Sequence, residues 1–155
     1  MDEQTNNVTT TVTLKCDAFE ECAMEFSCPS QVLVIDRTNG PADILVDLLG
    51  RLFEQQVSVL LATGTDEAFY ALNCCEFDLI IVGLGEDRAD QFSLLYDLRR
   101  EYGQMPVMVV GDDLSHDDLE RCREYAVHEV IEMPRRAAEL KSAVFSIVQQ
   151  YLQCA

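Results

Sequence analysis

Short, continuous apolar runs recur along most of this sequence and constrain its fold more than any other feature. The runs are rich in Val and Ile and cover residues 32–35, 57–61, 79–82, 107–110 and, more weakly, 130–131. A parallel strand that is covered on both faces needs continuous apolarity rather than an alternation of apolar and polar residues. We therefore predict five parallel strands, of which 32–35, 79–82 and 107–110 are buried in the centre of the sheet.

The segments between these runs have the spacing of amphipathic helices. The first of them carries one wide apolar stripe of Ile44, Leu45, Leu48, Leu49, Leu52 and Phe53. Ser115, followed three residues later by Asp118, resembles a capping box and predicts the start of another helix. Strands that alternate with helices predict an α/β fold with a doubly wound, five-stranded parallel sheet. The flavodoxin-like strand order 2-1-3-4-5 is the one expected at this size.

The length of 155 residues suits one ordinary domain. The regular pattern starts at Gln31, so we predict a domain over 31–155 and, before it, an acidic extension over 1–30 that is mobile or loosely docked. The apolar runs are far shorter than the ~20 residues that a membrane span needs. The first residues also lack the pattern of a signal peptide. We expect a cytoplasmic protein that does not act at a membrane.

The charge of the chain narrows the choice of partners. Twenty-eight acidic residues against eleven basic ones give a net charge of −17. Such a surface repels nucleic-acid backbones and anionic lipids. A basic protein partner remains open, and so does the simpler role of keeping the chain soluble.

The seven cysteines are scattered and show no C-x2-C pair. This pattern favours reduced thiols over a disulfide framework. Cys16, Cys22 and Cys28 recur every six residues, but no second cluster of ligands accompanies them, so we predict no metal site.

The strand-like segments, taken in order, resemble the receiver domains of bacterial response regulators, the CheY-like family. QVLVIDR resembles the family's first strand, FDLIIVGLGEDRADQF its third strand and loop, MPVMVVGD its fourth strand, and AVHEVIEMP its fifth strand with the usual proline. The resemblance covers residues 31–152. It implies a CheY-like sheet and a place in two-component signal transduction or a phosphorelay.

The family's phosphorylation site is altered in this sequence. The resemblance puts Gly83 at the phosphoacceptor carboxylate, Asp36 and Arg37 at the Mg²⁺-binding acid pair, Gly111 at the hydroxyl and Met133 at the lysine. Glycine has no oxygen to phosphorylate and arginine cannot bind a cation. We therefore predict a degenerate receiver with no phosphotransfer, no enzymatic activity, no cofactor and no metal, in which Asp36 bonds backbone amides or pairs with Arg37.

We make structural predictions for three of the altered positions, Gly83, Gly111 and Met133. We interpret Gly83 and Gly111 as tight exits from strands. Met133 is flexible and apolar, and we expect it to pack inward and fill the emptied pocket. The domain would then be held in one conformation.

Two sets of residues are candidate sites beyond the phosphorylation positions. The candidate anion-contacting residues are Arg37, Arg88, Arg135 and Arg136, which either form a small anion site or pair with acids of the same loops. The candidate interaction surface, which the family implies, comprises Asp117, Asp118, Arg121, Val130, Lys141 and Val144.

Our first hypothesis is a pseudo-receiver that acts by phosphorylation-independent protein–protein interaction or dimerisation. Two alternatives stay open. One is a ligand- or anion-sensing domain that uses the vacated pocket, and the other is a phosphorelay receiver with displaced chemistry.

Overall fold

The computed structural model describes residues 30–37, 40–53, 56–86, 88–133 and 136–152. Except for Ser30, the predicted extension over 1–30 lies outside the described residues. The strands are β1 (Ser30–Ile35), β2 (Val57–Ala62), β3 (Leu79–Leu84), β4 (Val107–Gly111) and β5 (Glu129–Glu132). The helices are α3 (Asp43–Leu52), α4 (Thr65–Cys74), α5 (Arg88–Glu101), α6 (His116–Glu124) and α7 (Ala137–Tyr151).

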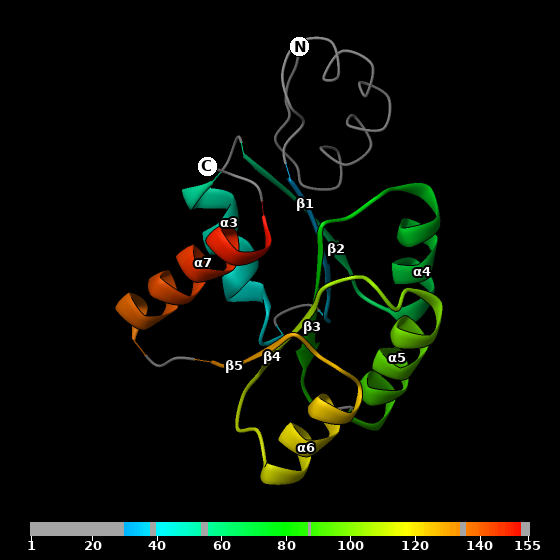
Figure 1. Cartoon of the computed structure of the whole chain (residues 1–155). Helices are drawn as coiled ribbons and strands as arrows, with labels where there is room; N and C mark the ends of the chain where they lie inside the picture. The colour runs from blue at the N-terminus through cyan, green and yellow to red at the C-terminus, as the bar shows by residue number, and fades with distance from the viewer. Residues whose placement is uncertain (1–29, 38–39, 54–55, 87, 134–135, 153–155) are drawn as a thin grey trace.

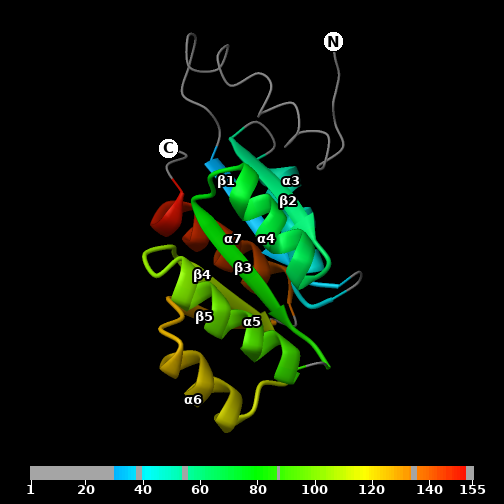
Figure 2. The ribbon, with the colours of Figure 1, turned by 90° about the vertical axis from the view of Figure 1, so that its right-hand side faces the viewer.

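The five strands form one parallel sheet in the order β2-β1-β3-β4-β5. The helices α3 and α7 cover one face of the sheet, and α4, α5 and α6 cover the other (Figures 1 and 2). This is the predicted doubly wound α/β fold with the flavodoxin-like strand order. Among the described residues, no helix is both long and apolar enough to cross a lipid bilayer.

Each face of the sheet has its own apolar core. Val32, Val34 and Ile81 pack toward α3 and α7, whereas Leu33 and Ile80 pack toward α4, α5 and α6. Neighbouring residues point to opposite faces of a strand, so a continuous apolar run supplies both cores at once. The three runs predicted to be central are buried throughout.

Helix α3 departs from the predicted stripe at one position. Leu45 and Leu49 are fully buried, but Ile44 is 52% exposed. A stripe that includes pairs of adjacent residues is wider than the contact between one helix and a sheet, so its margin is left in solvent.

The two ends of α6 have regular capping. At its start, Ser115 and Asp118 exchange side-chain and backbone hydrogen bonds in the predicted capping box. At its end, the Ala126 amide donates to the Arg123 carbonyl and the Val127 amide to the Cys122 carbonyl, while Ala126 has a φ of 55°. This is a Schellman motif with alanine at the left-handed position that usually belongs to glycine.

Candidate functional site

Parallel pairing brings the carboxyl ends of β1, β3, β4 and β5 to one edge of the sheet, where ligands of such folds bind. Asp36 follows β1 directly at this edge and is only 4% exposed. Its carboxylate accepts hydrogen bonds from the amides of Arg37 (2.7 Å) and Ala42 (2.8 Å). Asp36 therefore bonds backbone amides, as its sequence context predicted.

Burial raises the pKa of Asp36 above its ordinary value. The two backbone hydrogen bonds and the Arg37 guanidinium oppose this effect but do not cancel it. The carboxyl group is thus enclosed by the fold rather than presented to solvent.

The Asp36 carboxylate occupies the space beside Gly83, the position that the resemblance assigned to the phosphoacceptor. A Cβ atom added at Gly83 would overlap this carboxylate, and so would a Cβ atom added at Gly40. Asp36 therefore lies between two glycines that have to lack side chains for it to fit.

The space over Gly111, the position that the resemblance assigned to the hydroxyl, is filled in a similar way. A Cβ atom added there would overlap the side chain of Leu114, which comes from the loop after β4. No described glycine has a positive φ, and Gly83 and Gly111 both lie within strands. Gly83 is therefore not a strand exit, because β3 continues to Leu84, whereas Gly111 is the last residue of β4. At both positions the space over the backbone is what requires glycine.

Met133 does not fill the vacated space as we expected. It is half-buried against the core on the α3 and α7 side, and it lines a cavity of about 670 Å³ at the carboxyl edge. Asp36 and Leu114 fill the positions over Gly83 and Gly111 instead.

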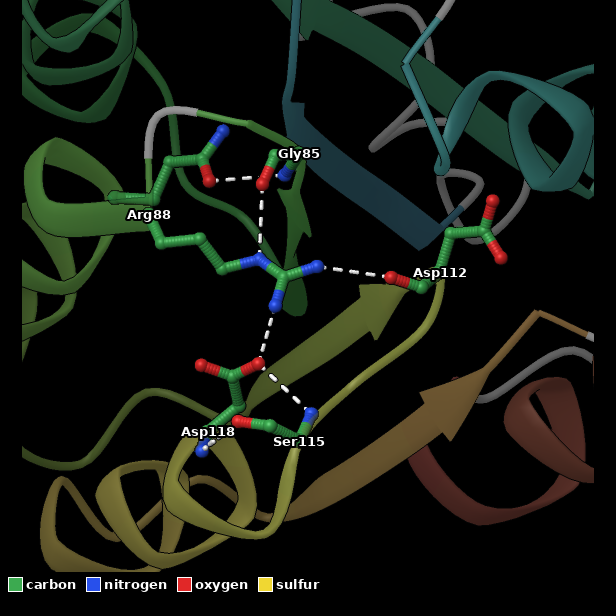
Figure 3. Close-up of polar contacts among 6 residues, drawn as sticks. Gly85, Arg88, Asp112, Ser115 and Asp118 are labelled. Atoms are coloured by element: carbon green, nitrogen blue, oxygen red, sulfur yellow. Dashed lines mark hydrogen bonds and ion pairs between the residues drawn. The ribbon is translucent and has the colours of Figure 1, made fainter.

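Arg88 connects three parts of this edge, a set of contacts that we call the Arg88 bridge. Its Nε donates to the Gly85 carbonyl (2.9 Å) and one terminal nitrogen donates to the Asp112 carbonyl (2.8 Å). The other terminal nitrogen forms an ion pair with the Asp118 carboxylate. The bridge therefore joins the end of β3 and the start of α5 to the β4–α6 loop and to the first turn of α6 (Figure 3).

Asp118 serves the bridge and the helix cap together. The Asp118 carboxylate oxygen that pairs with Arg88 also accepts from the Ser115 amide at 2.9 Å. Burial disfavours its charge, but the hydrogen bonds from Ser115 and the pairing with Arg88 outweigh burial and hold the pKa of Asp118 below its ordinary value. Asp118 is thus ionised and structural.

Two further arginines connect α5 and α6. Arg99 donates through Nε to the Tyr125 carbonyl just after α6, at 3.0 Å. The Arg121 guanidinium lies over the Phe92 ring, 5.0 Å from its centroid. Helix α6 is therefore held against α5 at its beginning, its middle and its end.

Three of the four arginines predicted at the edge lie in the described part of the chain, and these three do not form a cluster of free cations. Arg37 and Arg88 line the cavity, but Arg37 faces Glu86 at 4.0 Å and Arg88 is engaged in the bridge. Arg136 is exposed and is not among the residues that line the cavity. Arg135 lies outside the described residues. Internal pairing is therefore the better description of Arg37 and Arg88.

The predicted interaction surface needs two corrections. Val144 is completely buried in the core beneath α7, and Asp118 is held in the cap and the bridge. Both face inward because they lie on the sides of α7 and α6 that contact the core and α5. The exposed members are Asp117, Arg121 and Lys141, while Val130 is half-buried.

Sequence reasoning missed Leu114 and Gly40, as well as the bridge made by Arg88. Leu114 is the lone apolar residue within the polar segment GDDLSHDD, which is a weak signal that it is buried. Nothing local marks Gly40 or the partners of Arg88, because these contacts join segments that are distant in the chain or depend on the path of a loop.

Solved response-regulator structures share this fold. The phosphorylated cyanobacterial phytochrome response regulator RcpA matches with a TM-score of 0.68 at 19% identity, over 82% of this chain and 96% of that one. A response regulator from Thermotoga maritima matches with a TM-score of 0.62 at 22% identity, over 79% and 99%. The Vibrio cholerae chemotaxis protein CheY4 matches with a TM-score of 0.62 at 16% identity, over 80% and 99%.

No family model and no curated protein matches the sequence. At these levels of identity, the similarity shows that the chain has the CheY-like receiver fold.

Proposed function

We propose that this chain is a pseudo-receiver, a signalling module of the cytoplasm that acts through protein–protein interaction without phosphorylation or enzymatic activity. The proposal rests mainly on one observation. The place where a receiver fold would carry its phosphoacceptor side chain is Gly83, and the space beside it is filled by the buried Asp36 carboxylate.

The donor set also does not fit the Mg²⁺ ion that phosphorylation in this fold family uses. Asp36 directs its carboxylate oxygens to two backbone amides, and its neighbour Arg37 contributes a positive charge. Gly83 contributes no side-chain ligand. A hard cation needs several oxygen ligands, which these residues do not supply.

A phosphorelay receiver with displaced chemistry would need another acid as its nucleophile. Glu86, in the loop beyond β3, has an 87% exposed side chain and faces Arg37 at 4.0 Å, whereas Asp36 lies beside Gly83. A nucleophilic carboxylate must meet the phosphoryl donor in line and must have its developing charge neutralised. Asp36 is buried and hydrogen-bonded on both oxygens, so it meets neither condition. An anion-sensing role has a cavity in its favour, but the two described arginines that line the cavity each face an acidic or carbonyl partner.

The Arg88 bridge supports a domain with one stable conformation. It joins the β4–α6 loop to α5, and Arg99 and Arg121 hold the rest of α6. A partner surface on α6 is then available at all times, which suits a scaffold. The exposed part of α6 carries Asp117, Glu120 and Glu124 together with Arg121 and Arg123, and Arg123 pairs with Glu120. The small excess of acids favours a basic partner.

Phosphorylation is tested by incubating the full chain with acetyl phosphate, and separately with beryllofluoride, each with Mg²⁺. Intact mass and amide NMR shifts are recorded, with a phosphorylatable receiver such as RcpA treated in parallel. We expect no mass increase and no shift in this chain. A phosphoryl adduct that is absent from Asp36→Asn would contradict the proposal and favour a phosphorelay receiver with displaced chemistry. Shifts at Arg37 on titration with inorganic phosphate would favour the anion-sensing role.

The partner surface is tested by reversing charge on α6. Asp117→Lys should weaken the binding of a basic protein partner and change the free energy of unfolding by less than about 0.5 kcal/mol. Glu76→Lys is the matched control, since it makes the same charge change at an exposed position just after α4, away from α6. Equal binding by both variants would argue against α6 as the surface.

A further inference from the structure

The two edges of the sheet differ in how they are protected from further pairing. At one edge, β5 is four residues long and carries Glu129 and Glu132. Short strands and charged side chains keep an edge strand from pairing with another segment. At the opposite edge, β2 is six residues long, and its sequence VSVLLA contains neither a charged residue nor a proline (Figure 2). The edge of β2 therefore lacks the protection that β5 has.

The outer side of β2 offers both backbone groups and apolar side chains. The Ala62 carbonyl accepts from the Asp36 amide just after β1, at 3.0 Å. Alternate residues of a parallel strand turn their backbone groups to the same side, so Val59 and Leu61 turn theirs away from β1. No strand of the described chain lies on that side. Leu60 and Leu61 are only half-buried, one on each face of the sheet, whereas β3 and β4 are buried throughout.

The extension before β1 contains a segment with the pattern of a strand. Residues 8–15, which lie outside the described residues, have the sequence VTTTVTLK. Val8, Val12 and Leu14 are separated by even numbers of residues, so they fall on one face of an extended chain. Six of the eight residues are β-branched, the type that is enriched in strands. The sequence of this segment therefore suits an edge position with one apolar face.

We propose that residues 8–15 pair with the outer edge of β2 in the same chain and form a sixth strand. The length of the connection allows it. Residues 16–29, which join the segment to β1, span up to about 45 Å when extended. β2 is about 20 Å long, and a strand added beside it lies about 10 Å from β1. The segment therefore reaches the edge of β2 in either direction.

A segment of the same chain fits this edge better than a second copy does. A second copy carries the same net charge of −17 and is repelled, whereas residues 8–15 contain one lysine and no acid. The connection through residues 16–29 also keeps the segment at a high effective concentration near β2. This inference goes beyond the proposed function and does not depend on it, because it uses only the edge of β2 and the sequence of the extension.

Amide hydrogen exchange of the full chain, followed by NMR under reducing conditions, tests the proposal. Pairing protects the amides of residues 8–15 that face β2, and it also protects the outward amides of Val59 and Leu61. We expect both sets of amides to exchange at least about tenfold more slowly than in an unstructured peptide.

A pair of prolines breaks the proposed strand selectively. Thr11→Pro combined with Val12→Pro removes two neighbouring amides, one of which faces β2 in any register. Exchange at Val59 and Leu61 should then become faster by about tenfold or more. Exchange at Ile81 in the central strand β3 should stay unchanged, which shows that the domain is still folded.

Gln4→Pro combined with Thr5→Pro is the matched control, because it makes the same kind of change in the extension outside the segment, and it should leave exchange at Val59 and Leu61 unchanged. Exchange of residues 8–15 at the rate of an unstructured peptide would overturn the proposal, and this result needs no variant. The same effect of both proline pairs on Val59 and Leu61 would also overturn it. Protection that weakens on dilution would assign the edge to a second copy and contradict pairing within one chain.

Discussion

The two faces of the sheet are covered by helices that are held in different ways. On one face, α5 and α6 are joined by polar contacts of Arg88, Arg99 and Arg121 in addition to their apolar core. On the other face, α3 and α7 rest on an apolar core, and Phe53, just after α3, packs against Phe145 of α7 at the outer margin.

This difference shows how one fold can combine a face whose helices are held rigidly with a face that leaves apolar side chains accessible. Arginine contacts to carbonyls and a carboxylate have directional geometry, so they fix how α6 lies beside the loops of the carboxyl edge. Apolar packing has no such direction, and at the margin of α3 and α7 it leaves apolar side chains in solvent. The first face is suited to hold a single conformation, whereas the second keeps apolar side chains accessible.

The strongest test of this comparison removes one core residue from each face. Leu49→Ala on α3 and Leu95→Ala on α5 should each lower the free energy of unfolding by about 2–5 kcal/mol, because both side chains are fully enclosed. The sheet separates the two sites, so the double variant should lose the sum of the two effects within about 0.5 kcal/mol in urea denaturation. A larger deviation from additivity would show that the two cores are coupled.

A second test concerns the filled site at the edge between the two faces. Gly83→Ala should lower the free energy of unfolding by about 1–3 kcal/mol, because the added methyl group meets the Asp36 carboxylate. Gly50→Ala is the control, since Gly50 lies in α3 with open space around it and should stabilise the chain by about 0.5–1 kcal/mol. Combining Gly83→Ala with Asp36→Ala should cost less than the sum of the two single changes, and an additive result would contradict the overlap.

A third test removes the Arg88 bridge. Arg88→Met keeps the apolar stem but leaves the Asp118 carboxylate and the Asp112 carbonyl without this donor, so we expect a loss of about 1–3 kcal/mol. Arg100→Met, at a side chain that is 59% exposed, should change stability by less than about 0.5 kcal/mol. Hydrogen exchange should become faster at residues 112–118 in the Arg88 variant alone. Unchanged exchange there would show that the bridge does not hold the loop.

The low pKa of Asp118 gives the bridge a pH dependence. Its pKa is lower in the folded chain than in the unfolded chain, where it is about 3.9, so its stabilising effect is complete well above that pH and is lost as the pH falls through the folded value. The stability difference between the wild type and Asp118→Asn should therefore be constant from about pH 7 to pH 5 and shrink below about pH 4. Urea denaturation across this range measures it, and a difference that stays constant in acid would contradict the assignment.

The smallest expected effect is at the end of α6. Ala126 has a left-handed φ of 55°, which alanine adopts at a cost and glycine does not. Ala126→Gly should raise the free energy of unfolding by about 1 kcal/mol without changing hydrogen exchange at the Arg88 bridge. A loss of stability would mean that the alanine methyl group makes contacts worth more than the backbone strain.

The sequence determined the strands and the capping box at Ser115, because each depends on residues that are close together in the chain. The strand order followed from the general rules for connections between parallel strands, which leave few topologies at this size. Continuous apolar runs indicate strands that are covered on both faces, and a serine followed three residues later by an acid indicates the start of a helix. The sequence also predicts that the phosphorylation chemistry is lost, because Gly83, Gly111 and Met133, which the resemblance assigns to that chemistry, lack the atoms that it needs.

Tertiary structure alone decided what occupies the altered site and which residues face outward. Asp36 reaches the space over Gly83 from another strand, and Arg88 meets Asp118 thirty residues further along the chain. Val144 is buried and Ile44 exposed although both belong to apolar helical stripes, because burial depends on where the neighbouring helix and the sheet lie. Local patterns carry the periodicity of an element, whereas the contacts between elements depend on side-chain volume and direction at positions that the chain brings together only when it folds.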